Sequence, residues 1–271
     1  IRMKLIKHHY TLFLNIAVSI SAACLTYAVC LYMAELLLHV SAVHEAGYIC
    51  SMLFIIPGFP FITSGIDLAK LDLRSGLERL TYSIIIVLVA TMFAWIMALL
   101  LKLQPQDFVA LHLGSMMHLV LRLIASFCGV FGFSIMFNSS VYIAATAACI
   151  GAVANTLRLE LVDYTGMPSA AAAFIGALTA GLLASIIKRN HGYPRISLTV
   201  PSIVIMVPGL YLYRAIYNFG IMSLTEAVLW FAAAIMIIVS LPLGLIFARI
   251  LTDRTFRYCS CLLYTSDAAD D

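Results

Sequence analysis

The chain has 271 residues, of which 63% are hydrophobic and 11% are charged, and its formal net charge is +3 at pH 7. A soluble domain has about 45–50% apolar and about 25% charged residues, so this composition excludes a water-soluble globule and indicates the lipid bilayer as solvent. Lys and Arg number 16 against 13 Asp and Glu, which also excludes nucleic-acid binding as a main activity.

Long apolar runs recur along the whole chain. A spanning helix needs about 20 mainly apolar residues, and eight runs approach or exceed that length. They predict an all-α polytopic membrane protein with about eight transmembrane helices and no room for a soluble domain. The runs are Thr11–Val40, Gly47–Ile66, Leu80–Leu101, His118–Phe137, Val141–Leu157, Thr165–Ile187, Ile196–Tyr217 and Glu226–Ala248.

Basic residues are distributed unevenly between the two sides of this topology. Because cytoplasmic loops retain Lys and Arg, the bias predicts that both ends of the chain face the cytoplasm. The predicted outer loops hold only Lys102 and Arg158, and Arg122 is expected to reach from its span toward the outer surface. The predicted inner segments hold twelve: Arg2, Lys4, Lys7, Lys70, Arg74, Arg79, Lys188, Arg189, Arg195, Arg249, Arg254 and Arg257.

A Pro-Gly pair interrupts two of the runs. Pro57-Gly58 lies in the second run and Pro208-Gly209 in the seventh, and adding 151 to the first numbers gives the second. Proline lacks an N–H and clashes with the preceding turn, so each pair frees backbone groups in mid-helix. In lipid such groups need protein or a water-filled cavity. The alternative is a kink that serves packing alone.

The two interrupted runs are five spans apart, and an odd displacement predicts opposite directions through the membrane. Inverted repeats with broken helices are the architecture of many secondary transporters. The complete protein is then expected to have about ten spans in two halves of five. Residues 1–104 would hold three spans of the first half and residues 105–258 the second half, and residues 261–271 read as a tail derived from a sequencing adapter. The start on Ile1 suggests a missing N-terminus.

Several motifs around these breaks resemble those of the bacterial threonine/serine exporter family, in the form with both halves on one chain. The resemblance covers nearly all of residues 11–250, and the family's N-terminal region and first spans are absent. It implies export of threonine or serine across the bacterial inner membrane by proton antiport, or of a dicarboxylate such as succinate, as in some relatives. The motifs are Ile56-Pro57-Gly58-Phe59-Pro60, Asp67, Ser75-Gly76, Arg79-Leu80, Gly129 to Asn138, Arg158, Thr199-Val200-Pro201 and Val207 to Arg214.

Few ionisable residues lie within the spans, and each is a functional hypothesis because burial in lipid is costly. Asp67 is the candidate for proton coupling, with an interfacial pairing to Lys70 or Arg74 as the alternative. Arg214 could bind a substrate carboxylate or neutralise Asp67. Asn218 is the repeat equivalent of Asp67.

The substrate is predicted to bind between the two breaks. The predicted binding residues are Pro57, Gly58, Pro208, Gly209, Arg214 and Asn218. The expected partners are a small polar metabolite, protons and the bilayer, with a homo-oligomer left open. No enzyme motif, metal site or cofactor motif is recognised. A non-transporting membrane scaffold and a channel are the alternatives from other functional classes.

Overall fold

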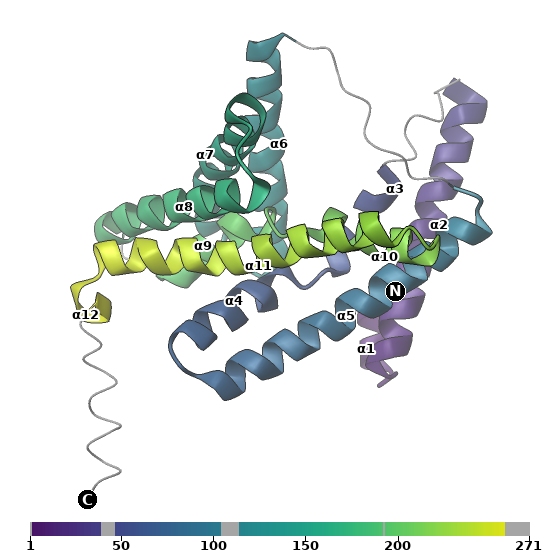
Figure 1. Ribbon diagram of the computed structural model, residues 1–271, viewed down its shortest axis with the longest axis horizontal. Helices are drawn as coiled ribbons and strands as arrows, with labels where there is room; N and C mark the ends of the chain where they lie inside the picture. The colour runs from purple at the N-terminus through teal and green to yellow at the C-terminus, as the bar shows by residue number, and fades with distance from the viewer. Residues whose placement is uncertain (1, 39–46, 104–113, 192, 258–271) are drawn as a thin grey trace, which may run out of the picture. The chain divides into compact units, whose positions relative to one another are not determined.

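A computed structural model of the chain describes residues 2–38, 47–103, 114–191 and 193–257. The predicted tail at 261–271 lies outside these ranges. The described residues form helices and no strands (Figure 1). The helices are α1 Arg2–Lys7, α2 Leu12–Leu38, α3 Gly47–Cys50, the 3₁₀ turn η2 Leu53–Ile55, α4 Gly58–Ala69, α5 Leu73–Leu100, α6 Ser115–Met136, α7 Val141–Thr165, α8 Ser169–His191, α9 Arg195–Val204, α10 Gly209–Gly220, α11 Leu224–Thr252 and α12 Arg254–Arg257.

The all-helical membrane fold is confirmed. Six described helices are long and apolar enough to cross a membrane, namely α2, α5, α6, α7, α8 and α11. Two further spans arise if each bent pair counts as one: residues 47–55 with α4, bent by 55°, and α9 with α10, bent by 42°. These are the two runs in which Pro-Gly pairs were predicted to interrupt a span.

Two predicted boundaries are wrong. Helix α5 begins at Leu73 and not at the predicted Leu80, so Arg74 and Arg79 are helical residues. The fifth run was expected to end at Leu157, with Arg158 in a loop, yet α7 continues to Thr165. The helix ends where Gly166 takes the left-handed conformation, with φ 64°, and donates its N–H to the Val162 carbonyl. Arg158 is therefore a helical residue.

The chain folds into two compact units that are interleaved in sequence. The first comprises residues 1–61, 77–113 and 208–235, and the second comprises residues 62–76, 114–207 and 236–271. These units differ from the predicted halves, residues 1–104 and 105–258, which describe the two copies of the sequence repeat. The division into those halves stays a prediction.

In the first unit, α2, α3, α5 and α10 share one apolar core. Its members include Ile20, Met52, Ala90 and Tyr213, each at most 1% exposed. Tyr48 is also fully buried, and its hydroxyl donates a hydrogen bond of 2.8 Å to the Ala94 carbonyl. A buried hydroxyl without a partner would cost several kcal/mol in an apolar medium, roughly 2–7, so this bond fixes α3 against α5.

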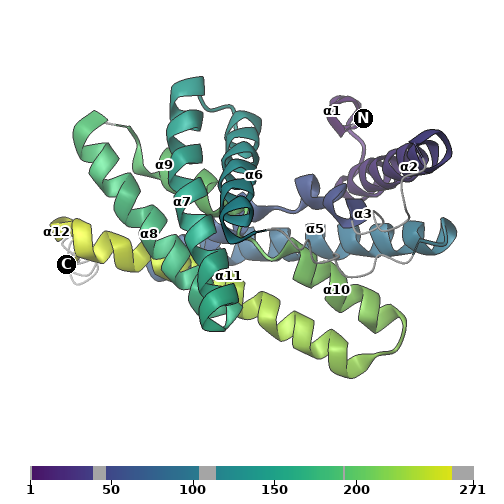
Figure 2. The ribbon, with the colours of Figure 1, turned by 90° about the horizontal axis from the view of Figure 1, so that it is seen from above.

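In the second unit, α7 is packed through small residues. Figures 1 and 2 both show α6 and α7 side by side. A Cβ on Gly151 of α7 would lie 2.8 Å from the Ser202 carbonyl oxygen of α9, and the Ser202 hydroxyl donates to the Ala147 carbonyl at 2.9 Å. Close backbone approach of this kind is how membrane helices associate where apolar burial gives little advantage over lipid.

The offset of 151 found in the sequence extends to the secondary structure. Adding 151 to the bounds of α4, residues 58–69, gives those of α10, residues 209–220, and both helices lead into a long helix of 28 or 29 residues. The connecting turns also match, because Leu71 and its equivalent Met222 both have positive φ, 64° and 61°. The Asp72 and Ser223 N–H groups close these turns on the Asp67 and Asn218 carbonyls.

Candidate functional site

The two Pro-Gly breaks meet in the first unit. Gly58, Pro208 and Gly209 are buried and Pro57 is half-buried. A Cβ on Gly209 would lie 2.7 Å from Leu53 Cδ2 and 2.7 Å from Ile56 Cδ1, the residues directly before the first break. A side chain at position 209 would push the terminal methyl groups of Leu53 and Ile56 aside, so the two interrupted segments lie in close contact at Gly209.

Each break begins a new helix in the same way. Pro57 and Pro208 precede α4 and α10, and their carbonyls accept the N–H groups of Phe61 and Leu212 at 3.2 and 3.1 Å. Proline suits a helix start because its φ is already helical and the missing N–H would be unpaired there. The positive end of the α10 dipole therefore lies at Gly209, beside the first break.

Tyr213 was not predicted as a site residue, although it is one helical turn from Gly209 on the same face of α10. It is 1% exposed, and its hydroxyl has no hydrogen-bond partner among the described residues. Its ring stacks on Tyr217 with centroids 6.2 Å apart. A buried hydroxyl that is unsatisfied in the resting protein is a candidate contact for a polar ligand.

Arg214 and Asn218 lie in α10 of the first unit, as expected, but they have structural contacts of their own. The Arg214 guanidinium lies 4.6 Å above the Trp230 ring of α11, a cation–π contact. The Asn218 amide donates to the Arg214 carbonyl at 2.8 Å. Arg214 is five residues after Gly209, which places it on a different helix face from the contact with the first break.

Asp67 belongs to the second unit, near the end of α4, and its side chain is half-buried. Its backbone carbonyl accepts the N–H groups of Lys70 at 3.0 Å and Asp72 at 3.1 Å, which ends the helix. Because Arg214 lies in the first unit, the predicted neutralisation of Asp67 by Arg214 stays a prediction.

A polar seam between α6 and α7 was missed by the sequence analysis. Arg122 pairs with Glu160 at 2.9 Å and with Asp163, and its expected reach toward the outer surface stays a prediction. Deeper in the seam, the Asn155 amide donates to the Ser126 hydroxyl at 2.9 Å. The seam was hidden because α7 was predicted to end before both acids. Their i, i+3 spacing, which places Glu160 and Asp163 on one helix face, was the available signal.

Two further hydroxyls in the same helices are buried. Ser134 is 0% exposed and Thr156 is 5% exposed, and neither has a hydrogen-bond partner in the part of the chain that the structure describes. Across those same ranges, no group of three or more His, Cys, Asp or Glu side chains could hold a metal ion.

Comparisons with known families agree with the motifs. A family model described as Threonine/Serine exporter, ThrE, matches residues 122–251, and a second threonine/serine exporter model matches residues 1–102. Matches to both models on one chain are consistent with a two-half threonine/serine exporter. No curated protein and no solved structure gives a significant match.

Proposed function

Because the chain belongs to the threonine/serine exporter family, we propose that it exports threonine or serine from the bacterial cytoplasm by proton antiport. The observation that carries this proposal is the repeated broken helix, whose two breaks lie in contact at Gly209. Transporters commonly place substrate where discontinuous helices meet, because helix ends there offer polar backbone groups within the membrane.

The residues around the breaks suggest how an amino acid would bind. The N-terminus of α10 at Gly209 favours a carboxylate, since free N–H groups and the helix dipole both attract negative charge. The Tyr213 hydroxyl, on the same face, can bond the substrate's polar groups. Carbonyls before Pro57 and Pro208 can accept hydrogen bonds from the ammonium group. Pro57, Gly58, Pro208, Gly209, Arg214 and Asn218 remain the proposed binding residues, with Arg214 as the alternative carboxylate partner.

Proton coupling is proposed for Asp67. A carboxyl group at the end of a broken helix can take up a proton from one side and release it to the other as access alternates. The proposed orientation, with both chain ends in the cytoplasm, places this end of α4 toward the inner membrane surface. The inverted relation of the two repeats follows from the same orientation and belongs to this proposal.

Efflux from proteoliposomes tests the mechanism. The full chain is reconstituted, labelled threonine is loaded, and a pH gradient is imposed. We expect Asp67→Asn to abolish the gradient-driven component. Asp72→Asn is the matched control, because Asp72 is exposed and its side chain accepts the Ser75 N–H at 3.4 Å, a capping role that Asn also fills. Gradient-driven efflux at the wild-type rate in Asp67→Asn would remove Asp67 from the mechanism.

The same assay separates the alternative functions. Labelled serine and succinate are tested beside threonine. Succinate flux without threonine flux would replace the amino acid with a dicarboxylate. Flux that ignores the pH gradient would indicate a channel, and no flux of any solute would indicate a scaffold.

A further inference from the structure

A cavity of about 220 Å³ lies in the second unit, where the ends of α4 and α11 meet the start of α9. Three basic residues and one acidic residue line it: Lys70, Arg195, Arg249 and Asp253. Its other walls are largely apolar, formed by Ile66, Ile196, Leu245, Ile246 and Phe256. The cavity therefore joins a cationic region to an apolar wall.

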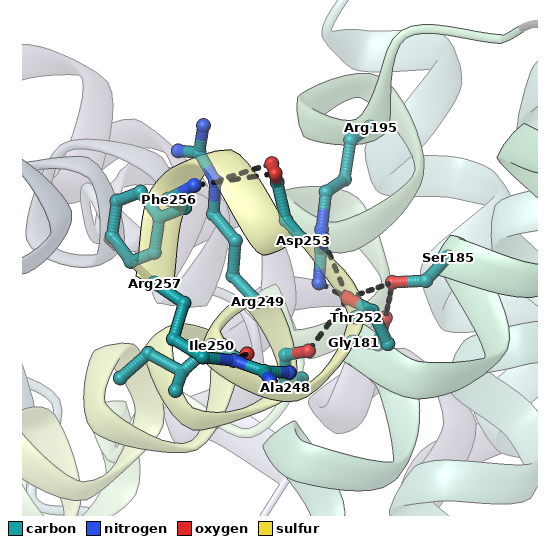
Figure 3. Close-up of polar contacts among 10 residues, drawn as sticks. All are labelled: Gly181, Ser185, Arg195, Ala248, Arg249, Ile250, Thr252, Asp253, Phe256 and Arg257. Carbon is teal, nitrogen blue, oxygen red and sulfur yellow. Dashed lines mark hydrogen bonds and ion pairs between the residues drawn. The ribbon is translucent and has the colours of Figure 1, made fainter. Parts of the chain in front are cut away.

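Arg195 is held in place by uncharged groups. Its guanidinium donates to the Thr252 hydroxyl at 3.1 Å and to the Gly181 carbonyl at 3.3 Å (Figure 3). Thr252 lies 3.1 Å from the Ser185 hydroxyl in turn. Because neither acceptor of Arg195 carries a charge, these bonds orient the guanidinium without neutralising it.

Arg249 is positioned by its neighbours at the end of α11. Its guanidinium lies 4.1 Å above the Phe256 ring, and its Nε is 3.5 Å from an Asp253 carboxylate oxygen (Figure 3). Asp253 also accepts the Phe256 N–H at 3.3 Å, which caps α12. One carboxylate against three cations leaves the cavity with an excess of two positive charges.

We propose that this cavity binds the phosphate of an anionic phospholipid headgroup. Helix α11 is long and apolar enough to span the membrane and ends at Thr252. On the proposed topology this end faces the cytoplasm, which puts the cavity near the inner membrane–water interface. Guanidinium groups match phosphate oxygens in a two-pronged geometry, and basic pockets between transmembrane helices bind lipid headgroups. The apolar wall, which includes the 51% exposed Ile196, favours a lipid over a free phosphate ion.

Lipid binding to the delipidated, full-chain protein in detergent tests the proposal. Native mass spectrometry measures the affinity for phosphatidylglycerol and for phosphatidylcholine, which carries no net charge. We expect phosphatidylglycerol to bind more tightly, and Arg195→Gln or Arg249→Gln to weaken it about fivefold each. Lys70→Gln is expected to act in the same direction, and Lys70 is exposed, so this variant should fold normally.

Arg257→Gln is the matched control. Arg257 is exposed and lies at the same end of α11, but it donates to the Ile250 and Leu251 carbonyls and does not line the cavity. Equal binding of the two lipids, or an equal loss in Arg257→Gln, would overturn the proposal. The affinity for inorganic phosphate is measured as well. If it binds as tightly as phosphatidylglycerol with the same dependence on Lys70, the ligand is a soluble anion and the lipid assignment fails.

Discussion

The contact between the two breaks can be tested by a mutant cycle on Gly209. In Gly209→Ala the new methyl carbon would lie 2.7 Å from Leu53 Cδ2 and Ile56 Cδ1. Ordinary carbon contacts begin near 3.4 Å, so both side chains must retreat by roughly 0.7 Å. Both atoms are terminal methyl groups of flexible side chains, so the cost lies at the lower end of the range of about 1–3 kcal/mol for overpacking. The higher helix propensity of alanine returns up to about 1 kcal/mol. We expect a net loss of at most about 1 kcal/mol in the free energy of unfolding.

The same substitution is then made in a Leu53→Ala/Ile56→Val background, which removes both contacting atoms. There Gly209→Ala should be neutral or slightly stabilising, so the coupling energy should be about 1–2 kcal/mol, within the range for residues in contact. Reversible unfolding in mixed micelles measures each corner of the cycle. Gly132→Ala is the control, because a Cβ there would meet nothing within 4 Å. An equal effect of Gly209→Ala in both backgrounds, within about 0.5 kcal/mol, would refute the contact.

Further predictions concern residues outside this contact. Gly244→Ala should destabilise the protein by about 2 kcal/mol, because its Cβ would lie 2.6 Å from the Phe174 carbonyl oxygen, a backbone atom that cannot rotate away. A stability equal to wild type in the same unfolding assay would contradict this packing. Tyr213→Phe should raise the unfolding free energy by about 1 kcal/mol or more, since it removes a buried hydroxyl that has no partner among the described residues. It should also raise the KM for export about tenfold if the hydroxyl bonds substrate, and an unchanged KM would exclude that role. Arg122→Gln should lower the free energy of unfolding by about 1–3 kcal/mol, because it leaves Glu160 without its 2.9 Å partner. The Arg122→Gln/Glu160→Gln double variant should recover part of this loss. Additive losses from the two substitutions would contradict an interaction between Arg122 and Glu160.

The sequence predicts the parts of the fold that depend on local composition. Apolar runs located the spans, and the two Pro-Gly pairs located the bends, because a missing N–H and a flexible neighbour act wherever they occur. The offset of 151 between the pairs is also the offset between the bounds of α4 and α10.

The failures involve partners that are distant in sequence. Helix α7 extends past Arg158 although charged residues follow, because Glu160 and Asp163 pair with Arg122 on α6. A hydropathy pattern treats those charges as exposed and ends the span too early. Tyr213 was missed for a related reason, since a tyrosine in an apolar run gives no indication of whether its hydroxyl has a partner. The Gly209 contact likewise depends on which side chains lie opposite.

The left-handed turns at Leu71 and Met222 have a consequence for how freely their loops can be exchanged. Non-glycine residues adopt this conformation at a cost of about 1–2 kcal/mol, and the two loops, Lys70-Leu71-Asp72 and Ile221-Met222-Ser223, share no residue at any matched position. The same conformation follows other helices at His9, Lys102 and Asn138, so this helix ending depends little on which side chains occupy it. Exchanging these two tripeptides should therefore yield chimeras that still insert and fold.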